Sequence, residues 1–362
     1  MKIVIAAWHL RDFNVGIGRY CRGLIAALGR VDRENEYQVL FPETTWRLPE
    51  WPNVHYRKIK LPVFRRRLWE QVVPQIAGSC DVLHFPYDAV VTWKRGKFVT
   101  SIHDVKPLIF NTLRPRRGWN SLVESLLIPD RQTQVDHVLT LSDCSRHDII
   151  ERLRLPAERV SVVYPGVDLD QFCPESVERQ QSGRPYILCV AGSDPTKNVE
   201  TLLRAFARLP SVLQKEHDVL LVGDLRRRQD LRDETRHLGI EGNVRFAGMV
   251  DDAQLVKHYQ QAVVLVFPSR YEGFGLPVVE AMACGCPVIS SNASSLPEAT
   301  GDAALLADPS DVDAFAKHLE QVLSDGTLRQ ELRERGLAQA AKFTWDRTAR
   351  ETVLVYRRVI ES

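Results

Sequence analysis

The sequence predicts an α/β protein of two domains, each built on a parallel sheet with helices on both faces. Short apolar runs typical of buried strands alternate with stretches of helical spacing along most of the chain. The alternation pauses at 171–184, a polar segment with Pro174 and Gly183 that has the composition of a linker. With 362 residues, the chain is long enough for each domain to bury a core.

The first domain is expected to span residues 1–170. A buried strand opens it, and a loop at 8–18 leads into a helix with apolar residues at helical spacing. The expected strands are 3–7, 37–41, 54–60, 82–85, 98–102 and 138–141, and the helix is 17–28. Ligands of open parallel sheets bind beyond the carboxyl ends of the strands, so functional residues are expected after strands 3–7, 98–102 and 138–141.

The second domain is expected to span residues 185–344 and to repeat the alternation. Its expected strands are 187–191, 219–222, 244–247 and 262–268, and its helices include 198–209 and 252–260, the latter capped by Asp251. The final segment, 345–362, carries a further helix at 345–360.

Composition excludes several classes of protein. Lys and Arg number 48 against 46 Asp and Glu, so the net charge of +2 does not predict a nucleic-acid partner. The seven cysteines are scattered without a Cys-x-x-Cys pair, which predicts reduced thiols in a cytoplasmic protein and no zinc site. No apolar run approaches the ~20 residues of a membrane span, and the first apolar run is too short for a signal peptide.

The richest stretch for chemistry is the turn after the apolar run 262–268. Gly273 and Gly275 allow the backbone to approach a ligand closely, Pro277 opens a short helix, and Gly285 closes it. The amides of 274–278 at the start of this helix favour phosphate or another oxyanion.

Two carboxylates frame that turn. Glu272 precedes it, and Glu280 lies about two helical turns further on, where it can face the same ligand. Carboxylates accept hydrogen bonds from sugar hydroxyls, so carboxylates beside an anion-binding turn indicate a ligand with both hydroxyls and phosphates. This combination predicts a nucleotide sugar.

The stretch resembles the signature of glycosyltransferase family 4, in which two glutamates are separated by seven residues. The flanking matches are Phe267-Pro-Ser269, Gly273-Phe-Gly-Leu-Pro277, Glu280-Ala-Met-Ala-Cys-Gly285 and Leu296-Pro-Glu298. The resemblance implies a retaining enzyme of the GT-B fold, with two Rossmann-like domains facing each other across a cleft and a final helix returning to the first domain. It also implies that no metal is needed.

The resemblance assigns roles around the turn. It implies that Glu272 is catalytic and touches the transferred sugar, and that Glu280 binds the ribose. The backbone amides near Phe274, Gly275 and Leu276 are implied to hold the sugar and the diphosphate. Without the resemblance, both glutamates could simply cap and solvate a helix.

A second glycine pair, Gly16 and Gly18, lies in the predicted loop before the helix 17–28, where a phosphate could rest on the helix amides. A dinucleotide fingerprint is disfavoured, because Cys21 stands where a third small residue is needed and no acid closes strand 37–41. In the family that it resembles, such a loop reaches the donor phosphates. The alternative is a simple tight turn.

His103 and Asp104 follow the strand 98–102, and an ionisable pair at this place is poorly explained by packing. A satisfied core histidine is the ordinary alternative for His103. The resemblance places such a pair near the donor sugar and the acceptor hydroxyl, which makes His103 the candidate catalytic residue of the first domain. His9, near the glycine pair, is the other histidine of interest.

A further candidate donor loop contains Ser193 and Lys197. Lys197 is expected to open a helix, where its charge would add to an N-terminus that favours a diphosphate, and it matches the family's lysine. Many members carry an arginine in this loop, whereas Ser193 and Thr196 stand here, so Arg19 or Arg270 could supply the missing contact. The alternative for Lys197 is a solvated surface residue.

Basic residues lie beside tryptophan at 65–69 and 114–119, near a third basic run at 57–60. This combination suits an anionic membrane surface, where the indole sits at the headgroup level, but solvated loops explain it equally well. Two interpretations therefore stay open: peripheral contact with the inner face of the cell membrane, and solvated surface loops.

The sequence as a whole predicts transfer of a hexosyl unit to a hydroxyl of a saccharide or lipid-linked glycan, in polysaccharide or lipopolysaccharide assembly. The matches at Ser290-Ser-Asn292 and around the central turn most resemble mannosyltransferases that use GDP-mannose. The alternatives are a related transferase using a UDP or dTDP sugar, a nucleotide-sugar epimerase, and a binder without activity. No cofactor and no nucleic-acid partner are expected.

Overall fold

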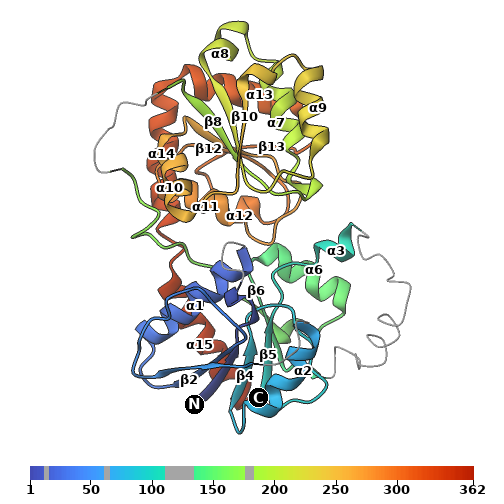
Figure 1. Ribbon diagram of the computed structural model, residues 1–362, viewed down its shortest axis with the longest axis vertical. Coiled ribbons are helices and arrows are strands. Elements are labelled where there is room, and N and C mark those ends of the chain that lie inside the picture. The colour runs from blue at the N-terminus through green and yellow to red at the C-terminus, as the bar shows by residue number, and fades with distance from the viewer. Residues whose placement is uncertain (12–15, 61–65, 111–133, 176–182) are drawn as a thin grey trace. The chain divides into compact units, whose positions relative to one another are not determined.

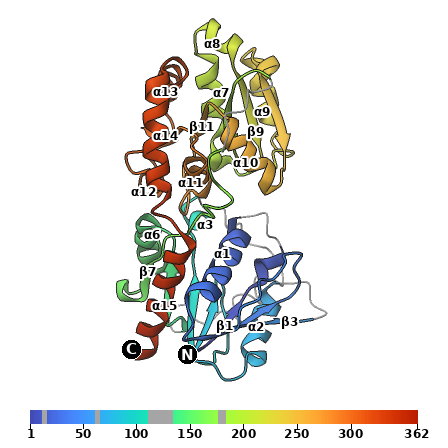
Figure 2. The ribbon, with the colours of Figure 1, turned by 90° about the vertical axis from the view of Figure 1, so that its left-hand side faces the viewer.

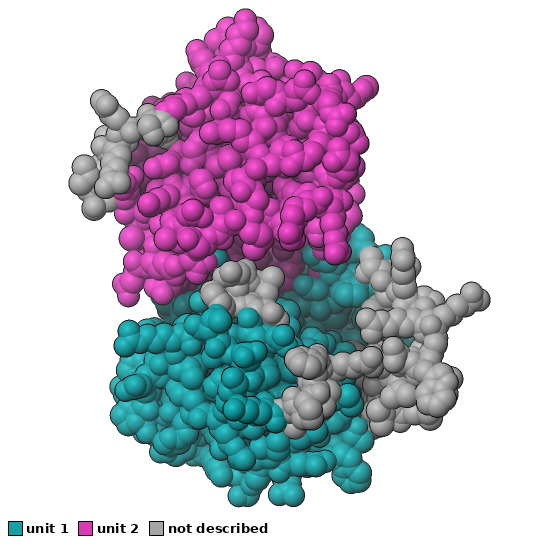
Figure 3. Space-filling model, viewed as in Figure 1, with its two compact units in different colours: residues 1–166, 344–362 teal, residues 167–343 magenta. Residues whose placement is uncertain are grey.

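The computed structural model describes residues 1–11, 16–60, 66–110, 134–175 and 183–362. The chain divides into two compact units, which are coloured separately in Figure 3. Unit 1 comprises 1–166 and 344–362, and unit 2 comprises 167–343. The division therefore falls at Gly166, ahead of the segment 171–184 that the sequence predicts as a linker.

Unit 1 is built on a parallel sheet of seven strands among the described residues, in the order β3-β2-β1-β4-β5-β6-β7 (Figure 1). The strands are β1 (Lys2–Ala6), β2 (Glu36–Phe41), β3 (Val54–Lys58), β4 (Val82–Phe85), β5 (Lys97–Ser101), β6 (His137–Thr140) and β7 (Val160–Val162). Each predicted strand is present, with ends that differ by at most two residues. β1, β4 and β6 are almost entirely buried, as expected for parallel strands covered on both faces.

The helices of unit 1 connect these strands. They are η1 (Trp8–Arg11), α1 (Gly16–Val31), α2 (Arg66–Ile76), α3 (Lys106–Ile109), α6 (Asp143–Leu153), η2 (Ala157–Arg159) and α15 (Trp345–Glu361). One apolar cluster lies between η1, α2 and strands β1, β4 and β5, and includes Trp69, Phe85 and Tyr87.

The last helix, α15, returns to unit 1 and lies beside α1, the dark red and blue helices of Figure 2. The two helices are so close that a Cβ placed on Gly23 would lie 2.1 Å from the ring of Trp345. On the sheet side, the hydroxyl of Tyr356 lies 2.6 Å from Nδ1 of His84, at the centre of β4. The C-terminal helix is therefore part of the core of unit 1.

Unit 2 repeats the architecture with a parallel sheet of six strands within its described part, in the order β10-β9-β8-β11-β12-β13. The strands are β8 (Tyr186–Val190), β9 (Asp218–Val222), β10 (Val244–Gly248), β11 (Val264–Phe267), β12 (Val288–Ser291) and β13 (Leu305–Ala307). β8 and β11 lie at the centre, so the loops that follow them, which carry Lys197 and Glu272, are neighbours.

The helices of unit 2 cover this sheet. They are η3 (Pro195–Lys197), α7 (Val199–Ala207), α8 (Ser211–Glu216), α9 (Gln229–His237), η4 (Glu241–Asn243), α10 (Asp252–Gln261), α11 (Leu276–Ala283), α12 (Leu296–Thr300), α13 (Val312–Ser324) and α14 (Gly326–Ala340). Asp251 caps α10 in a capping box with Gln254, which confirms the predicted cap. Phe206, Phe315 and Leu319 join α7 and α13 in the core.

Candidate functional site

The turn between β11 and α11 needs glycine at one position. Gly275, the N-cap of α11, has φ +105°, a backbone conformation that L side chains rarely adopt. A Cβ on Gly275 would also lie 2.7 Å from Cδ2 of Leu296. Two residues beyond the helix, Gly285 has φ +75° and ends α11, as the sequence predicts. The turn is thus held in a shape that a larger residue would disturb.

Glu272 lies in this turn and its carboxylate is paired. Its Oε1 accepts hydrogen bonds from Nζ of Lys197, at 2.7 Å, and from the hydroxyl of Ser269. The side chains of Glu272 and Lys197 are only 11% and 21% exposed, so water screens the pair weakly. The structure thus joins two of the predicted site residues, and Lys197 is not a solvated surface lysine.

The backbone of Glu272 is fixed by two serines that the sequence analysis did not identify. Its N–H donates to the hydroxyl of Ser294 at 2.8 Å, and its carbonyl accepts from Ser294 at 3.1 Å and Ser295 at 2.9 Å. Both serines precede α12, beside the Leu296-Pro-Glu298 match that the sequence does show. A run of serines before this match was the available signal.

The loop that carries Lys197 is tied to the turn at Glu272. The side-chain amide of Asn198 donates to the carbonyl of Pro268 at 2.8 Å, and the N–H of Arg270 donates to the carbonyl of Thr196 at 2.8 Å. Asn198 adopts a left-handed backbone (φ +55°), which asparagine tolerates better than most residues. Lys197 therefore ends a short 3-10 turn before α7, instead of opening the helix as predicted.

Ser193 and Thr196 occupy the positions where an arginine is common in the family. Ser193 is exposed, whereas the Thr196 hydroxyl donates to the carboxylate of Asp194 at 2.8 Å. The same carboxylate accepts from the N–H of Thr196 at 2.9 Å. Thr196 thus shapes the loop, and Ser193 is the more accessible of the two hydroxyls.

The predicted donor-binding residues in and just before α11 differ in what they can present to a ligand. Glu280 is 5% exposed, and its Oε2 accepts from the hydroxyl of Tyr259 at 3.1 Å. The ring of Phe274 is buried edge-on against Phe343, with centroids 5.1 Å apart. The side chain of Phe274 therefore belongs to the core, while Leu276 is half-buried at the start of the helix.

One of the backbone amides predicted to bind an anion is already hydrogen-bonded within the turn. The sequence predicts open amides over 274–278, but the N–H of Val278 donates to the carbonyl of Gly275 at 3.0 Å. The stretch of amides that remains for an anion is therefore shorter than predicted.

The predicted residues of unit 1 lie at the carboxyl ends of its strands. Gly16 and Gly18 fall in the first turn of α1, whereas the sequence places them in the preceding loop; residues 12–15 lie outside the described part of the chain. Gly16 is exposed, and a Cβ there would meet nothing within 4 Å. Gly18 is buried within unit 1.

His103 follows β5 and is held from two sides. Its Nε2 lies 3.3 Å from the carbonyl of Pro86, and its ring packs edge-on against Tyr20 at 4.7 Å. Burial lowers the pKa of His103 to about 4; His9 lowers it further, whereas the Pro86 carbonyl and Asp88 raise it. The imidazole is therefore neutral at pH 7, and its Nε2 carries the proton that faces Pro86.

The interpretation of Trp69, beside the basic run 65–69, as a membrane-facing residue is wrong. Trp69 is fully buried and packs edge-on against Trp8, with centroids 5.5 Å apart. Its neighbours Arg66 and Arg67 pair with the buried Glu70, at 3.1 and 3.2 Å. Trp69 packs inward because it lies on the core face of α2, so it cannot reach a membrane; the run 114–119 lies outside the described residues.

The described residues carry neither a metal-binding cluster nor a membrane-spanning helix. Among the described residues, no three His, Cys, Asp or Glu side chains are grouped so that they could hold a metal ion. None of the helices in the described part of the chain is long and apolar enough to cross a bilayer. The seven cysteines, all of them described, are free thiols.

Two family descriptions match the chain. Residues 15–171 match "Glycosyltransferase Family 4" and residues 175–339 match "Glycosyl transferases group 1". The chain is also similar to an O-antigen chain mannosyltransferase B of Escherichia coli, with 31% identity over 99% of this chain and 100% of that protein. An MMP alpha-(1->4)-mannosyltransferase of Mycolicibacterium hassiacum is 34% identical over 70% of this chain and 60% of its own length.

Solved structures share the fold at lower identity. A sucrose-phosphate synthase of Thermosynechococcus elongatus has a TM-score of 0.75 at 21% identity. The superposition covers 100% of this chain and 99% of the synthase chain. WaaG, a glycosyltransferase involved in lipopolysaccharide biosynthesis, has a TM-score of 0.74 at 15% identity, covering 98% and 99%. These likenesses confirm the predicted fold class of two Rossmann-like units with the last helix in the first unit. Together with the full-length match to the mannosyltransferase, they show that the chain belongs to glycosyltransferase family 4 and is a glycosyltransferase.

Proposed function

We propose that the protein is a retaining mannosyltransferase that moves mannose from GDP-mannose to a hydroxyl of a saccharide or lipid-linked glycan. The observation that carries this proposal is the Lys197–Glu272 pair, held at 2.7 Å in the loops after β8 and β11. An ammonium group in this place can neutralise a leaving diphosphate, and a fixed carboxylate can accept hydrogen bonds from a sugar. The two groups thus suit the two halves of a nucleotide sugar.

The reaction follows from these roles. The bond between C1 of the mannose and the β-phosphate oxygen breaks, and a bond forms between C1 and the acceptor oxygen on the same face. The departing phosphate oxygen takes the proton of the acceptor hydroxyl, so no separate base is needed. Lys197 stabilises the charge that develops on the phosphate, Glu272 orients the sugar, and neutral His103 contributes a hydrogen bond near the reacting hydroxyl.

The donor and the setting are proposed from the relatives. Two proteins that are more than 30% identical to this chain are named as mannosyltransferases, one of them for the O-antigen chain. From these names we propose that mannose is the transferred sugar. We propose polysaccharide or lipopolysaccharide assembly as the setting. We further propose that the enzyme works in the cytoplasm, at the inner membrane face when the acceptor is lipid-linked, and that it needs no divalent metal.

A transfer assay tests this proposal. The purified protein is incubated with GDP-mannose, UDP-glucose or dTDP-rhamnose, with octyl α-D-mannopyranoside as acceptor, in EDTA or in Mg²⁺. The expected result is a mannosylated product from GDP-mannose alone, with an α anomeric signal by NMR and equal rates in EDTA and Mg²⁺. Transfer from a UDP or dTDP sugar would show that GDP-mannose is not the donor. A β-linked product would show that the anomeric configuration is inverted and not retained.

A further inference from the structure

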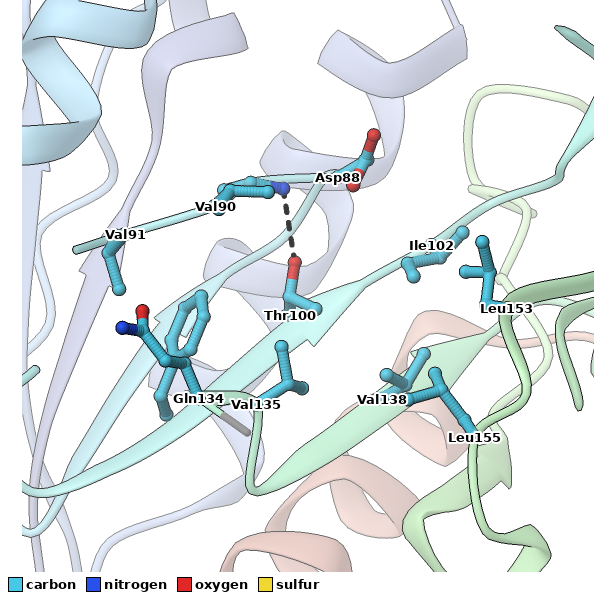
Figure 4. Close-up of a pocket in the computed structure, with 12 residues that line it drawn as sticks. Asp88, Val90, Val91, Thr100, Ile102, Gln134, Val135, Val138, Leu153 and Leu155 are labelled. Carbon is cyan, nitrogen blue, oxygen red and sulfur yellow. Dashed lines mark hydrogen bonds between the residues drawn. The ribbon is translucent and has the colours of Figure 1, made fainter. Parts of the chain in front are cut away.

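The residues that lead from β4 into β5 are fixed where they pass α2. The side-chain amide of Gln71 donates to the carbonyl of Val90 at 2.7 Å and accepts from the N–H of Thr92 at 2.7 Å. The amide nitrogen of Gln134, which precedes β6, donates to the carbonyl of Thr92 at 3.2 Å. Figure 4 shows Val90 and Gln134 on the border of one hollow, whose other lining is mainly apolar. The backbone therefore has a fixed position at Thr92.

The next residues are fixed on the side of β4 and β6. Nζ of Lys94 donates to Oδ2 of Asp136 at 2.8 Å. Gly96 has φ +68°, and a Cβ there would lie 2.3 Å from the carbonyl oxygen of Cys80, so a residue with a side chain would not fit. Contacts on both sides thus define the path of residues 92–96, which we call the Trp93 loop.

Trp93 is exposed although the backbone around it is anchored. It is 70% exposed. The other described tryptophans are all buried or half-buried: Trp8, Trp46, Trp51, Trp69 and Trp345. Leu68 is 46% exposed and lies one turn before Gln71 on α2, on the side of the helix that the loop contacts. This face of unit 1 therefore presents apolar side chains that would gain free energy by leaving water.

Cations surround these apolar side chains. Arg95, Lys2 and Lys97 form no ion pair among the described residues. Burial raises the pKa of the Cys80 thiol and Asp81 raises it further, whereas the charges of Lys2 and Arg95 lower it, so these three charged groups lie close to Cys80. The charged side chains around the loop are four cations, Lys2, Lys94, Arg95 and Lys97, and two acids, Asp81 and Asp136. The surface is therefore cationic.

We propose that the Trp93 loop docks the protein on an anionic membrane, with the indole among the lipid headgroups and with Arg95 and Lys97 facing lipid phosphates. Tryptophan favours the interface between headgroups and hydrocarbon, and cations are attracted to the negative surface of a cytoplasmic leaflet. A stable protein partner would need about 800 Å² of complementary surface on this side, whereas a bilayer needs no complementary shape. The inference rests on the proposed function for its purpose, which is access to a lipid-linked acceptor.

The loop lies at the opposite end of the sheet from the proposed catalytic residue of unit 1. It leads into Lys97, the first residue of β5, whereas His103 follows the last residue, Ser101. The five residues of this strand span about 17 Å, so a docked loop does not cover the carboxyl ends of the strands. Docking and transfer to a soluble acceptor can therefore be measured separately.

Vesicle flotation tests the docking. The wild type, Trp93→Ala, Arg95→Glu and Arg227→Glu are mixed with vesicles of phosphatidylcholine, either alone or with an equal part of phosphatidylglycerol. Arg227 is an exposed arginine of unit 2 without an ion pair among the described residues, so its reversal changes the net charge equally and serves as the matched control. Thermal unfolding checks that each variant is folded, and transfer to octyl α-D-mannopyranoside without vesicles reports on the reaction.

The wild type is expected to bind the anionic vesicles and to lose this binding in high salt, because salt screens the attraction. Each unit of charge is worth about fivefold in binding, so Arg95→Glu should bind about 25-fold more weakly. Trp93→Ala is expected to bind about tenfold more weakly, because the indole leaves water on docking. Arg227→Glu should bind like the wild type, and every variant should keep the wild-type rate with the soluble acceptor.

Absence of wild-type binding to the anionic vesicles, equal binding to the neutral ones, or undiminished binding by Trp93→Ala would overturn the inference. Equal weakening by Arg95→Glu and Arg227→Glu would also overturn it, since net charge alone would then explain the binding. Docking as expected, without transfer from any nucleotide sugar, would overturn the proposed function and leave the docking surface in place.

Discussion

The two units place different chemistry at the carboxyl ends of similar sheets. In unit 2, opposite charges meet: Lys197 contacts Glu272 at 2.7 Å, between loops that also hydrogen-bond to each other. In unit 1, burial keeps His84 and His103 neutral at pH 7. Similar backbones thus support a charged network in one unit and a largely neutral surface in the other.

This difference matches the two substrates of a glycosyltransferase. A diphosphate brings negative charge that a fixed cation must balance, and under the proposed function Lys197 is that cation, beside the Glu272 carboxylate. A glycan acceptor is uncharged at its reacting end and needs hydrogen-bond acceptors. We therefore propose donor binding by unit 2 and acceptor binding by unit 1, and each half of this proposal can be tested separately.

The largest expected effect comes from breaking the charged pair of unit 2. Lys197→Ala and Glu272→Gln are each expected to lower the transfer rate by about a hundredfold or more, because each removes a group that acts on developing charge or on the sugar. The rate of GDP release from GDP-mannose with acceptor measures this.

Two controls accompany the pair. Glu320→Gln, an exposed acid on α13, is expected to keep the wild-type rate, and thermal unfolding checks the fold of each variant. A folded Lys197→Ala enzyme with near-normal turnover would contradict the assignment of the donor site to this pair.

A backbone substitution tests whether the turn shape of unit 2 is needed. Gly275→Ala is expected to destabilise the protein by about 1–3 kcal/mol, because alanine disfavours φ +105° and its Cβ would meet Leu296 at 2.7 Å. Urea unfolding measures the change. A variant as stable as the wild type would show that the turn relaxes easily and that its shape is not what positions Glu272.

The neutral histidines of unit 1 predict how stability depends on pH. Burial lowers the pKa of His84 to about 3, so the folded state binds no proton there while the unfolded chain titrates near its ordinary value. The contribution of neutral His84 to the free energy of unfolding is fully present above pH 6.5 and is lost as the pH falls. By pH 5 the loss from this single histidine is about 2 kcal/mol.

His84→Gln isolates this contribution. The variant loses the contact with Tyr356 and is expected to be less stable at pH 7, but its free energy of unfolding should fall less steeply between pH 6.5 and 5. Denaturant unfolding across that range measures both slopes. Identical slopes would mean that His84 titrates alike in the folded and unfolded chains.

The smallest expected effect on stability is at Gly16, the first residue of α1. A Cβ there meets nothing within 4 Å, so Gly16→Ala should leave stability unchanged or raise it by less than about 1 kcal/mol. If a donor phosphate approaches this backbone, KM for GDP-mannose should nevertheless rise. An unchanged KM would favour a plain helix start at this glycine.

The fold was largely predictable from the sequence because parallel strands buried on both faces leave contiguous apolar runs. The runs at 82–85 and 219–222 appear as strands within one residue of their predicted ends. The turn that carries the glutamates could also be predicted from the sequence, because Glu272, Gly275 and Glu280 lie close together in the chain. Local patterns of this kind need no knowledge of the tertiary structure.

The remaining features depend on contacts between distant segments. Lys197 and Glu272 are 75 positions apart, and only the adjacency of β8 and β11 brings them together. Trp69 reads as a candidate for a membrane surface beside its arginines, but the packing of α2 buries it.

The most direct test of a donor site at Lys197 and Glu272 is the thermal shift of the protein with nucleotide sugars in the absence of metal. GDP-mannose, GDP-fucose, UDP-glucose, UDP-N-acetylglucosamine and dTDP-rhamnose are compared on the wild type and on Lys197→Ala. GDP-mannose is expected to stabilise the wild type, by about 2.7 kcal/mol at a hundred times its Kd, and this shift is expected to disappear largely in Lys197→Ala. An equal shift in both proteins would contradict a donor site built on Lys197 and Glu272.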